Sequence, residues 1–174
     1  MARKVEIKNI LDCQREYLGD VLKEGYPRSK EWAEDAFTKA QKELGVPDNL
    51  MPRWYFCTEI DELNYHSDED RGVTLGRFVP IDGVIKLSAL LLWYGTQKVV
   101  EHVVYHEMCH VKHMTDILAT KNKTSMKNKF CRWVTEEQYA HGPAFKKYMK
   151  VCQYQDETVI DWINYLDECR VIDF

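Results

Sequence analysis

The sequence predicts a fold that mixes α-helices with β-strands, and three observations support this. Two segments near the N-terminus, 5–24 and 29–44, place apolar residues at helical spacing and are separated by a Gly-Tyr-Pro breaker. The middle of the chain holds three runs rich in aromatic and β-branched residues, which are typical of strands. A third and longer amphipathic segment, at about 97–119, predicts a helix.

The connections between these segments carry recognisable turn and cap signals. Asp82-Gly83 is a frequent hairpin turn and stands between the second and third strand candidates. Thr96 is a suitable N-cap for the long helix. A last amphipathic segment, 157–169, predicts a C-terminal helix that covers the core. The strand candidates are 54–60, 72–80 and 84–92, and the third can bend into a short helical turn.

Size and composition limit the class of protein. A chain of 174 residues, 45% hydrophobic and 30% charged, has the proportions of one ordinary globular domain. It contains no apolar stretch long enough to cross a bilayer, and its first residues do not resemble a secretory signal. The six cysteines include no C-x-x-C pair, so no zinc ribbon is encoded. We therefore expect reduced thiols in an intracellular protein, cytoplasmic or associated with the nucleoid or nucleus.

The long helix contains the motif H-E-x-x-H. Its histidines, His106 and His110, are four residues apart, so on a helix they project from one face with roughly 6 Å of rise between them. Two such histidines can hold one metal ion, and Glu107 beside them can accept a proton from water at that ion. Glu107 falls in the middle of the helix's apolar stripe, where packing alone would not favour a carboxylate.

A catalytic zinc site normally has three protein ligands and one open position. The third ligand is expected downstream of the motif, and Glu136, Glu137 and His141 are all candidates. His102 and His113 share the stripe of the motif pair and are expected to flank the site rather than bind the ion.

A basic run follows the long helix. No acidic residue occurs from position 117 to 135, and Phe130 and Trp133 lie among the cations. Such a run is commonly a solvated loop, but it could also bind phosphates, with the aromatic rings stacking on bases. The cations of the run are Lys121, Lys123, Lys127, Lys129 and Arg132.

The motif His106-Glu107-Met108-Cys109-His110, followed by His141-Gly142-Pro143-Ala144-Phe145-Lys146, resembles the SprT-like metalloprotease family, which includes Spartan. The stretch 85–92 is similar to the strand that precedes the motif helix in that family, and the likeness covers roughly 50–150. The resemblance implies that His106, His110 and His141 bind Zn²⁺ and that Glu107 is the general base.

The resemblance also implies a zincin-like α+β fold, in which a small, mostly antiparallel sheet packs on the motif helix between N- and C-terminal helices. Residues 1–174 would then be a single SprT-like domain, with N-terminal helices at 1–48, a metalloprotease core at 50–150 and a C-terminal helix at 151–174. The chain lacks the C-terminal zinc ribbon of some family members, so any DNA affinity would have to come from the domain itself.

The implied function is a zinc metalloendopeptidase that cleaves proteins associated with DNA or crosslinked to it, with single-stranded or damaged DNA as a partner. Two alternatives remain open: an intracellular zinc protease that cuts a regulatory protein without DNA, and a non-catalytic zinc-binding module. The extended peptide substrate is expected to pair with a strand such as 84–87. A positively charged side chain or a tyrosine is expected to stabilise the oxyanion, but the sequence does not identify which; Tyr139 and Tyr148 are near the site only in sequence.

Overall fold

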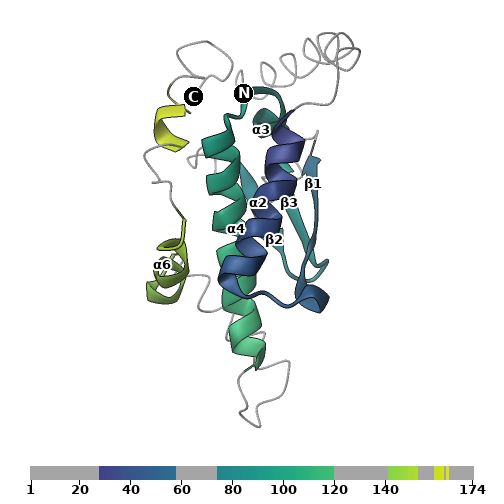
Figure 1. Ribbon diagram of the computed structural model, residues 1–174, viewed down its shortest axis with the longest axis vertical. Helices are drawn as coiled ribbons and strands as arrows, with labels where there is room; N and C mark the ends of the chain where they lie inside the picture. The colour runs from purple at the N-terminus through teal and green to yellow at the C-terminus, as the bar shows by residue number, and fades with distance from the viewer. Residues whose placement is uncertain (1–27, 58–73, 120–140, 153–158, 163, 165–174) are drawn as a thin grey trace, which may run out of the picture.

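The computed structural model describes residues 28–57, 74–119, 141–152, 159–162 and 164. In this part of the chain a layer of helices covers one face of a small sheet (Figure 1). The α+β class expected from the sequence is therefore confirmed. The predicted helix 5–24 and most of the predicted helix 157–169 lie outside the described residues.

The described sheet has three strands in the order β1-β3-β2, with β1 at Arg53–Cys57, β2 at Gly76–Val79 and β3 at Val84–Ser88. β2 and β3 pair antiparallel through the predicted turn at Asp82-Gly83, where Gly83 has the left-handed φ of 60° that favours glycine. β1 pairs with β3 in parallel, Tyr55 opposite Lys86. The sheet is thus mixed, whereas a mostly antiparallel one was expected.

The inner face of the sheet is apolar and packs against two helices. Trp54 and Phe56 of β1 alternate with exposed residues, and Trp54 stacks on Phe37 with ring centroids 4.9 Å apart. Phe37 belongs to α2, Arg28–Leu44, which runs beside α4, Gln97–Ala119, in front of the sheet (Figure 1). The core between them is fully buried and includes Ile85, Leu87, Val104, Met108 and Val111.

The third strand ends at Ser88 and the chain turns directly into α3, Ala89–Tyr94. The Ser88 hydroxyl accepts a hydrogen bond of 3.2 Å from the Leu90 amide, which caps this short helix. Thr96 caps the next helix in the same way, because its hydroxyl accepts from the Val99 amide at 3.4 Å. The strand that bends into a helical turn and the helix over 97–119 are both confirmed. The remaining described helices are η1, Asp48–Leu50, and α6, Pro143–Met149.

Among the described helices, none combines the length and apolarity that crossing a bilayer would require. Cys57, Cys109 and Cys152 are buried, and no disulfide joins them to one another. Cys109 lies on the core side of α4, and burial raises the pKa of its thiol to about 12.

Candidate metal centre

Two imidazoles of the site come from adjacent turns of α4. His106 and His110 lie on the side of the helix that faces Phe145 of α6, and each is half-buried. Their ring centroids are 5.1 Å apart. The opposite side of α4 is anchored by fully buried residues such as Val104 and Val111, so the core of the protein fixes the direction in which the two rings project.

The third imidazole comes from the segment that leads into α6. His141 precedes Pro143, the first residue of that helix, and its Nε2 lies 2.9 Å from the Nε2 of His106. Its ring centroid is 4.6 Å from that of His106 and 5.6 Å from that of His110. Of the three downstream candidates, the structure brings His141 to the motif pair; Glu136 and Glu137 lie outside the described residues.

The spacing of the three nitrogens suits a single metal ion. One ring nitrogen from each of His106, His110 and His141 lies within 4.8 Å of the other two. Zn–N distances of about 2.0–2.1 Å put the ligand nitrogens of a tetrahedral ion about 3.3 Å apart, inside the observed range. Three imidazoles with an open fourth direction are also a donor set that zinc favours. The residues therefore fit the ion on both distance and chemistry.

The backbone at His141 is unusual. Its φ of 70° is left-handed. Among the described residues other than glycine, His141 alone has a positive φ. Histidine tolerates this region better than most residues, but the conformation still costs of order 1–3 kcal/mol. Residues held in such a conformation cluster at functional sites, and here the conformation directs the ring toward α4.

Phe145 fills the space under all three imidazoles. Its buried ring has centroid distances of 4.8 Å to His106, 4.6 Å to His110 and 4.5 Å to His141. The segment H-G-P-A-F places this ring four residues after the histidine, in the first turn of α6. Phe145 thus provides an apolar base that orients the rings and excludes water from beneath them.

The surroundings of His106 keep its imidazole neutral. Burial, followed by the nearby rings of His110, His141 and His102, lowers the pKa of His106 from 6.5 to about 3. A neutral imidazole has the lone pair that a metal requires, so at neutral pH His106 is already in its metal-binding form.

Glu107 lies in the core between α4 and the sheet. Its side chain is 5% exposed, and Oε2 accepts a hydrogen bond of 2.8 Å from the backbone amide of Phe78 in β2. The neighbouring Gly76 leaves room for this carboxylate: a Cβ there would lie 2.9 Å from both Cγ and Oε1 of Glu107. The backbone of β2 therefore holds a carboxylate that the amphipathic pattern alone left without a partner.

The other histidines of α4 do not join the three-histidine group. His102 is buried, with its Nδ1 3.8 Å from the Sγ of Cys152, and His113 is also buried. Within the described residues, the group of metal-capable side chains consists of His106, His110 and His141. The flanking position expected for His102 and His113 agrees with this arrangement.

The strand expected to pair with a substrate and one of the two tyrosines near the site lie within the described residues. β3 is the central strand of the described sheet, with β1 on one side and β2 on the other, so the prediction that 84–87 pairs with a substrate is wrong. Tyr148 donates its hydroxyl hydrogen bond to Oδ2 of Asp116 at 2.6 Å, and Asp116 is also paired with Lys112 at 2.7 Å. That contact joins α6 to α4 and was not apparent from the sequence.

Several predicted residues fall outside the described part of the chain. They are Tyr139 and the whole basic run, Lys121, Lys123, Lys127, Lys129 and Arg132.

Comparison with protein-family models, with curated proteins and with solved structures gives no match for this chain. The geometry of the site is accordingly the basis for any functional assignment.

Proposed function

We propose that the chain is a zinc-dependent metalloendopeptidase of the SprT-like type, built on a zincin-like core. The observation that carries the proposal is the meeting of His106, His110 and His141 within 4.8 Å of one another, with Glu107 on the same helix. The first two histidines and the carboxylate belong to H-E-x-x-H, a pattern that unites a metal site with a general base.

Each residue has a role in this mechanism. His106, His110 and His141 would hold the ion, which supplies Lewis acidity toward water and the scissile carbonyl. Glu107 accepts the proton of the attacking water and returns it to the leaving amine. The Phe78 amide, 2.8 Å from Oε2, keeps the carboxylate in position. Phe145 keeps bulk water out of the space beneath the ligands.

The substrates that we propose are proteins bound or crosslinked to DNA. Its support is the pairing of H-E-x-x-H with the later H-G-P-A-F segment, on which the likeness to SprT-like proteases rests. The described sheet offers β1 and β2 as edge strands, and β2 is the one in contact with Glu107. An extended peptide that added to the β2 edge would lie beside the general base.

The test begins with metal content. The wild-type chain is expected to bind one zinc ion, and His106→Ala, His110→Ala and His141→Ala are each expected to weaken binding at least about a hundredfold, because even groups behind a ligand contribute 10–100-fold. Glu107→Gln should bind zinc like the wild type. An unchanged zinc affinity in His141→Ala would remove that residue from the site.

The second step is hydrolysis. The zinc-loaded chain is incubated with a DNA-binding protein, with and without single-stranded DNA, and compared with Glu107→Gln. We expect cleavage by the wild type that DNA stimulates, and a loss of about a hundredfold or more in Glu107→Gln. Cleavage that DNA does not stimulate would indicate a protease of another substrate class. A chain that binds zinc but cleaves nothing would indicate a non-catalytic binding module. Full hydrolysis by Glu107→Gln would exclude Glu107 as the base.

A further inference from the structure

One edge of the described sheet is β1, whose backbone is only partly used by its neighbour. The amide of Arg53 donates to the carbonyl of Gly83 at 2.9 Å, so alternate residues from Arg53 onward direct their backbone groups to β3. Trp54 and Phe56 direct theirs to the opposite side, which is the outer edge (Figure 1). Within the part of the chain that the structure describes, no hydrogen bond satisfies these backbone groups. The edge therefore offers donors and acceptors to a further strand.

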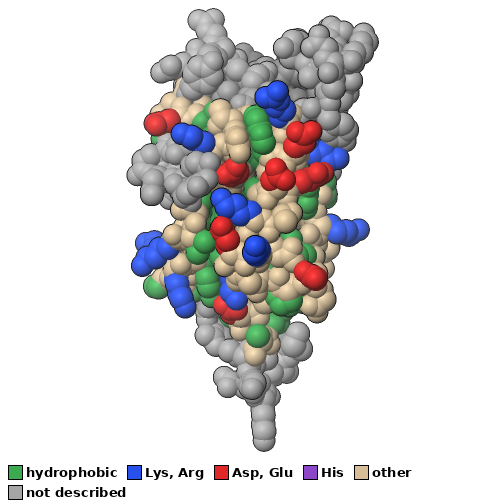
Figure 2. Space-filling view, viewed as in Figure 1, with side chains coloured by type: hydrophobic (Ala, Val, Ile, Leu, Met, Phe, Trp, Pro, Cys, Tyr) green, Lys and Arg blue, Asp and Glu red, His purple; other side chains and the backbone are tan. Residues whose placement is uncertain are grey.

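β1 lacks the features that usually keep an edge strand from pairing. Its register with β3 is continuous, without a bulge, and proline precedes the strand instead of interrupting it. Its centre is the aromatic run 54–56, and its one charged residue is Arg53 at the start. The helical face of the molecule differs, because acidic and basic side chains are interspersed over it, as is usual for a surface in water (Figure 2). An unprotected aromatic edge favours the addition of a strand.

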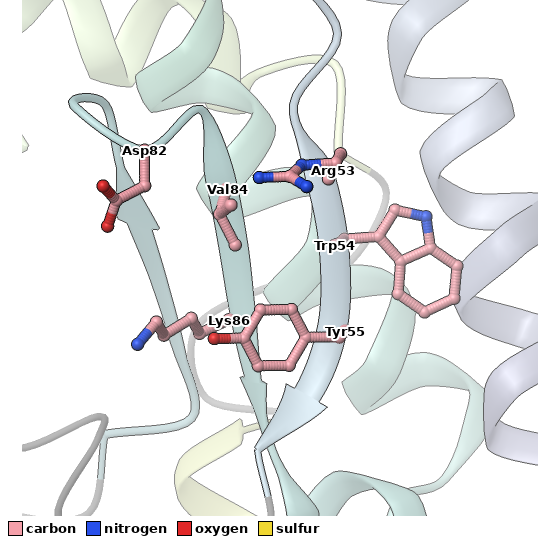
Figure 3. Close-up of a pocket in the computed structure, with 6 residues that line it drawn as sticks. All are labelled: Arg53, Trp54, Tyr55, Asp82, Val84 and Lys86. Atoms are coloured by element: carbon pink, nitrogen blue, oxygen red, sulfur yellow. The ribbon is translucent and has the colours of Figure 1, made fainter.

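The two sides of β1 determine which side chains an added strand should carry. Trp54 points toward the helices, where its ring stacks on Phe37 of α2, and Figure 3 shows Tyr55 directed to the other side. Trp54 and Phe56 are only partly buried, so apolar side chains opposite them would cover the remaining aromatic surface. On the outer side, a hollow of about 490 Å³ leaves room for the side chain between those two. This hollow is lined by Arg53, Trp54, Tyr55, Asp82, Val84 and Lys86.

Arg53 adds a preference for charge and direction. Its side chain is exposed, and a carboxylate directly opposite it on a neighbouring strand would form a favourable cross-strand pair. Antiparallel pairing is slightly more stable per residue than parallel pairing. In that direction the added strand meets Phe56 first, then Trp54 and then Arg53. The matching pattern is therefore apolar, any residue, apolar, acidic.

We propose that the outer edge of β1 binds an extended segment of a partner protein with this pattern, paired antiparallel. A second copy of the chain fits less well. Pairing β1 with itself would bring two copies of α2 over strands about 4.8 Å apart, whereas packed helices need about 8–10 Å. The edge differs from that of the proposed hydrolysis, because β2 lies on the other side of the sheet and contacts Glu107. The proposal is therefore independent of zinc and of cleavage.

The experiment measures the fluorescence anisotropy of the labelled peptide S-T-V-T-V-E-T-S with the full chain, in zinc and in a chelator. We expect saturable binding of equal affinity in both. N-methylation of the two valines removes the N–H groups that face β1 and should weaken binding at least about tenfold. N-methylation of the threonine between them and of the glutamate removes N–H groups that face away. That matched peptide should lose less than about threefold.

A change of charge tests the direction of the peptide. Arg53→Glu should weaken binding about three- to fivefold, and the peptide S-T-V-T-V-K-T-S should recover that loss with this variant. The control is Lys39→Glu, an exposed residue of α2 two positions after Phe37 and so on the other side of the helix. It should change affinity less than about twofold.

Amide hydrogen exchange locates the peptide on the sheet. At saturation the amides of Trp54 and Phe56 should exchange at least about tenfold more slowly, while that of Gly76 in β2 is unchanged. Three outcomes would overturn the proposal. They are no binding, equal losses for the two N-methylated peptides, and protection of Gly76 in place of Trp54 and Phe56. Dimerisation of the chain that the peptide reverses would likewise overturn it, because the edge would then belong to a second copy.

Discussion

The candidate metal centre is built from two regions that are held in different ways. The helix arm is α4, which carries His106, Glu107 and His110 and is buried along its length between α2 and the sheet. The short arm is the segment 141–149, which carries His141 and the seven-residue helix α6. It meets α4 through the Phe145 ring and the hydrogen bond from Tyr148.

The ligands of the two arms are positioned by different kinds of contact. The two histidines of the helix arm are positioned by the core of the whole domain, so disturbing them requires disturbing the fold. The third histidine is positioned by a few contacts at the site itself and by a left-handed backbone. A metal ion that bound all three would join the arms, and its binding energy would add to the stability of the short arm in particular.

The largest effect is expected from removing the ring that joins the arms. Phe145→Ala deletes a buried side chain in contact with all three imidazoles, at a cost of about 3–5 kcal/mol. We expect faster amide hydrogen exchange over 143–149 with little change in α4, and a zinc affinity reduced about 10–100-fold.

The control for Phe145 is Val151→Ala, because Val151 lies just after α6 and is 45% exposed. It should change stability by less than about 0.5 kcal/mol. If Phe145→Ala instead increased amide exchange in α4 and α6 equally, the two regions would form one cooperative unit.

A complementary change disturbs the helix arm without touching a ligand. In Gly76→Ala the new Cβ would lie 2.9 Å from Cγ and Oε1 of Glu107 and from Cγ1 of Val103. We expect a stability loss of about 1–3 kcal/mol from overpacking, and hydrolysis reduced more than about tenfold because the carboxylate moves. Zinc affinity should be nearly unchanged, since His106 and His110 keep their support.

Gly83→Ala is the matched glycine variant. Gly83 has a left-handed φ of 60° but open space around it, so the substitution costs about 1 kcal/mol through backbone strain alone. Stability should fall while hydrolysis per folded molecule stays at the wild-type level. Equal losses of hydrolysis in the two variants would show that Glu107 does not depend on the space at Gly76.

The two regions also differ in how far the sequence predicts them. The helix arm follows from periodicity: the apolar stripe, the cap at Thr96 and the i, i+4 histidines predict both its limits and the direction of His106 and His110. Periodicity does not choose among the three candidates for the third ligand, because a contact between residues 35 positions apart leaves no local pattern in the sequence. The choice of His141 came from resemblance to a family rather than from spacing.

What the sequence could not predict are contacts made by the backbone or set by topology. The amide that holds Glu107 belongs to Phe78, and any residue other than proline could supply it, so no residue type marks it. Strand order is equally hidden. The apolar run at 84–88 is compatible with an edge or a central strand, and only the parallel pairing with β1 makes it central.

The pH dependence of the free energy of unfolding tests how His106 of the helix arm is buried. Folding lowers the pKa of His106 from 6.5 to about 3, so the folded state prefers the neutral ring. Its contribution to stability is complete above pH 6.5 and is lost as the pH falls from 6.5 toward 3, because the unfolded chain takes up the proton first. Between about pH 7 and about pH 5 the metal-free protein should lose about 2 kcal/mol from this residue.

Denaturant titrations at several pH values measure that loss, and His106→Gln supplies the control. The variant cannot titrate at position 106, so its stability should fall less steeply over the same interval. Parallel curves for the two proteins would mean that the ring is not buried by the two arms as described. Because metal binding requires neutral imidazoles, zinc should raise the stability of the wild type at neutral pH and make its stability fall more steeply as the pH is lowered.

The smallest effect concerns the hydrogen bond that fixes the far end of the short arm. Tyr148→Phe removes the hydroxyl that donates to Oδ2 of Asp116 at 2.6 Å, while keeping the ring. A bond to a charged acceptor in a partly buried place should contribute about 1–2 kcal/mol, and zinc affinity should fall less than about tenfold. Chemical denaturation and zinc titration measure the two quantities.

A double-mutant cycle isolates this bond from the neighbouring ion pair. Asp116→Asn removes the charge that Lys112 also uses at 2.7 Å, so its own cost combines both contacts. In the double variant the loss should be smaller than the sum of the single losses by about 1 kcal/mol, which is the coupling between Tyr148 and Asp116. Additive losses would mean that the coupling energy between Tyr148 and Asp116 is zero. Phe145 would then be the contact that holds the short arm on α4.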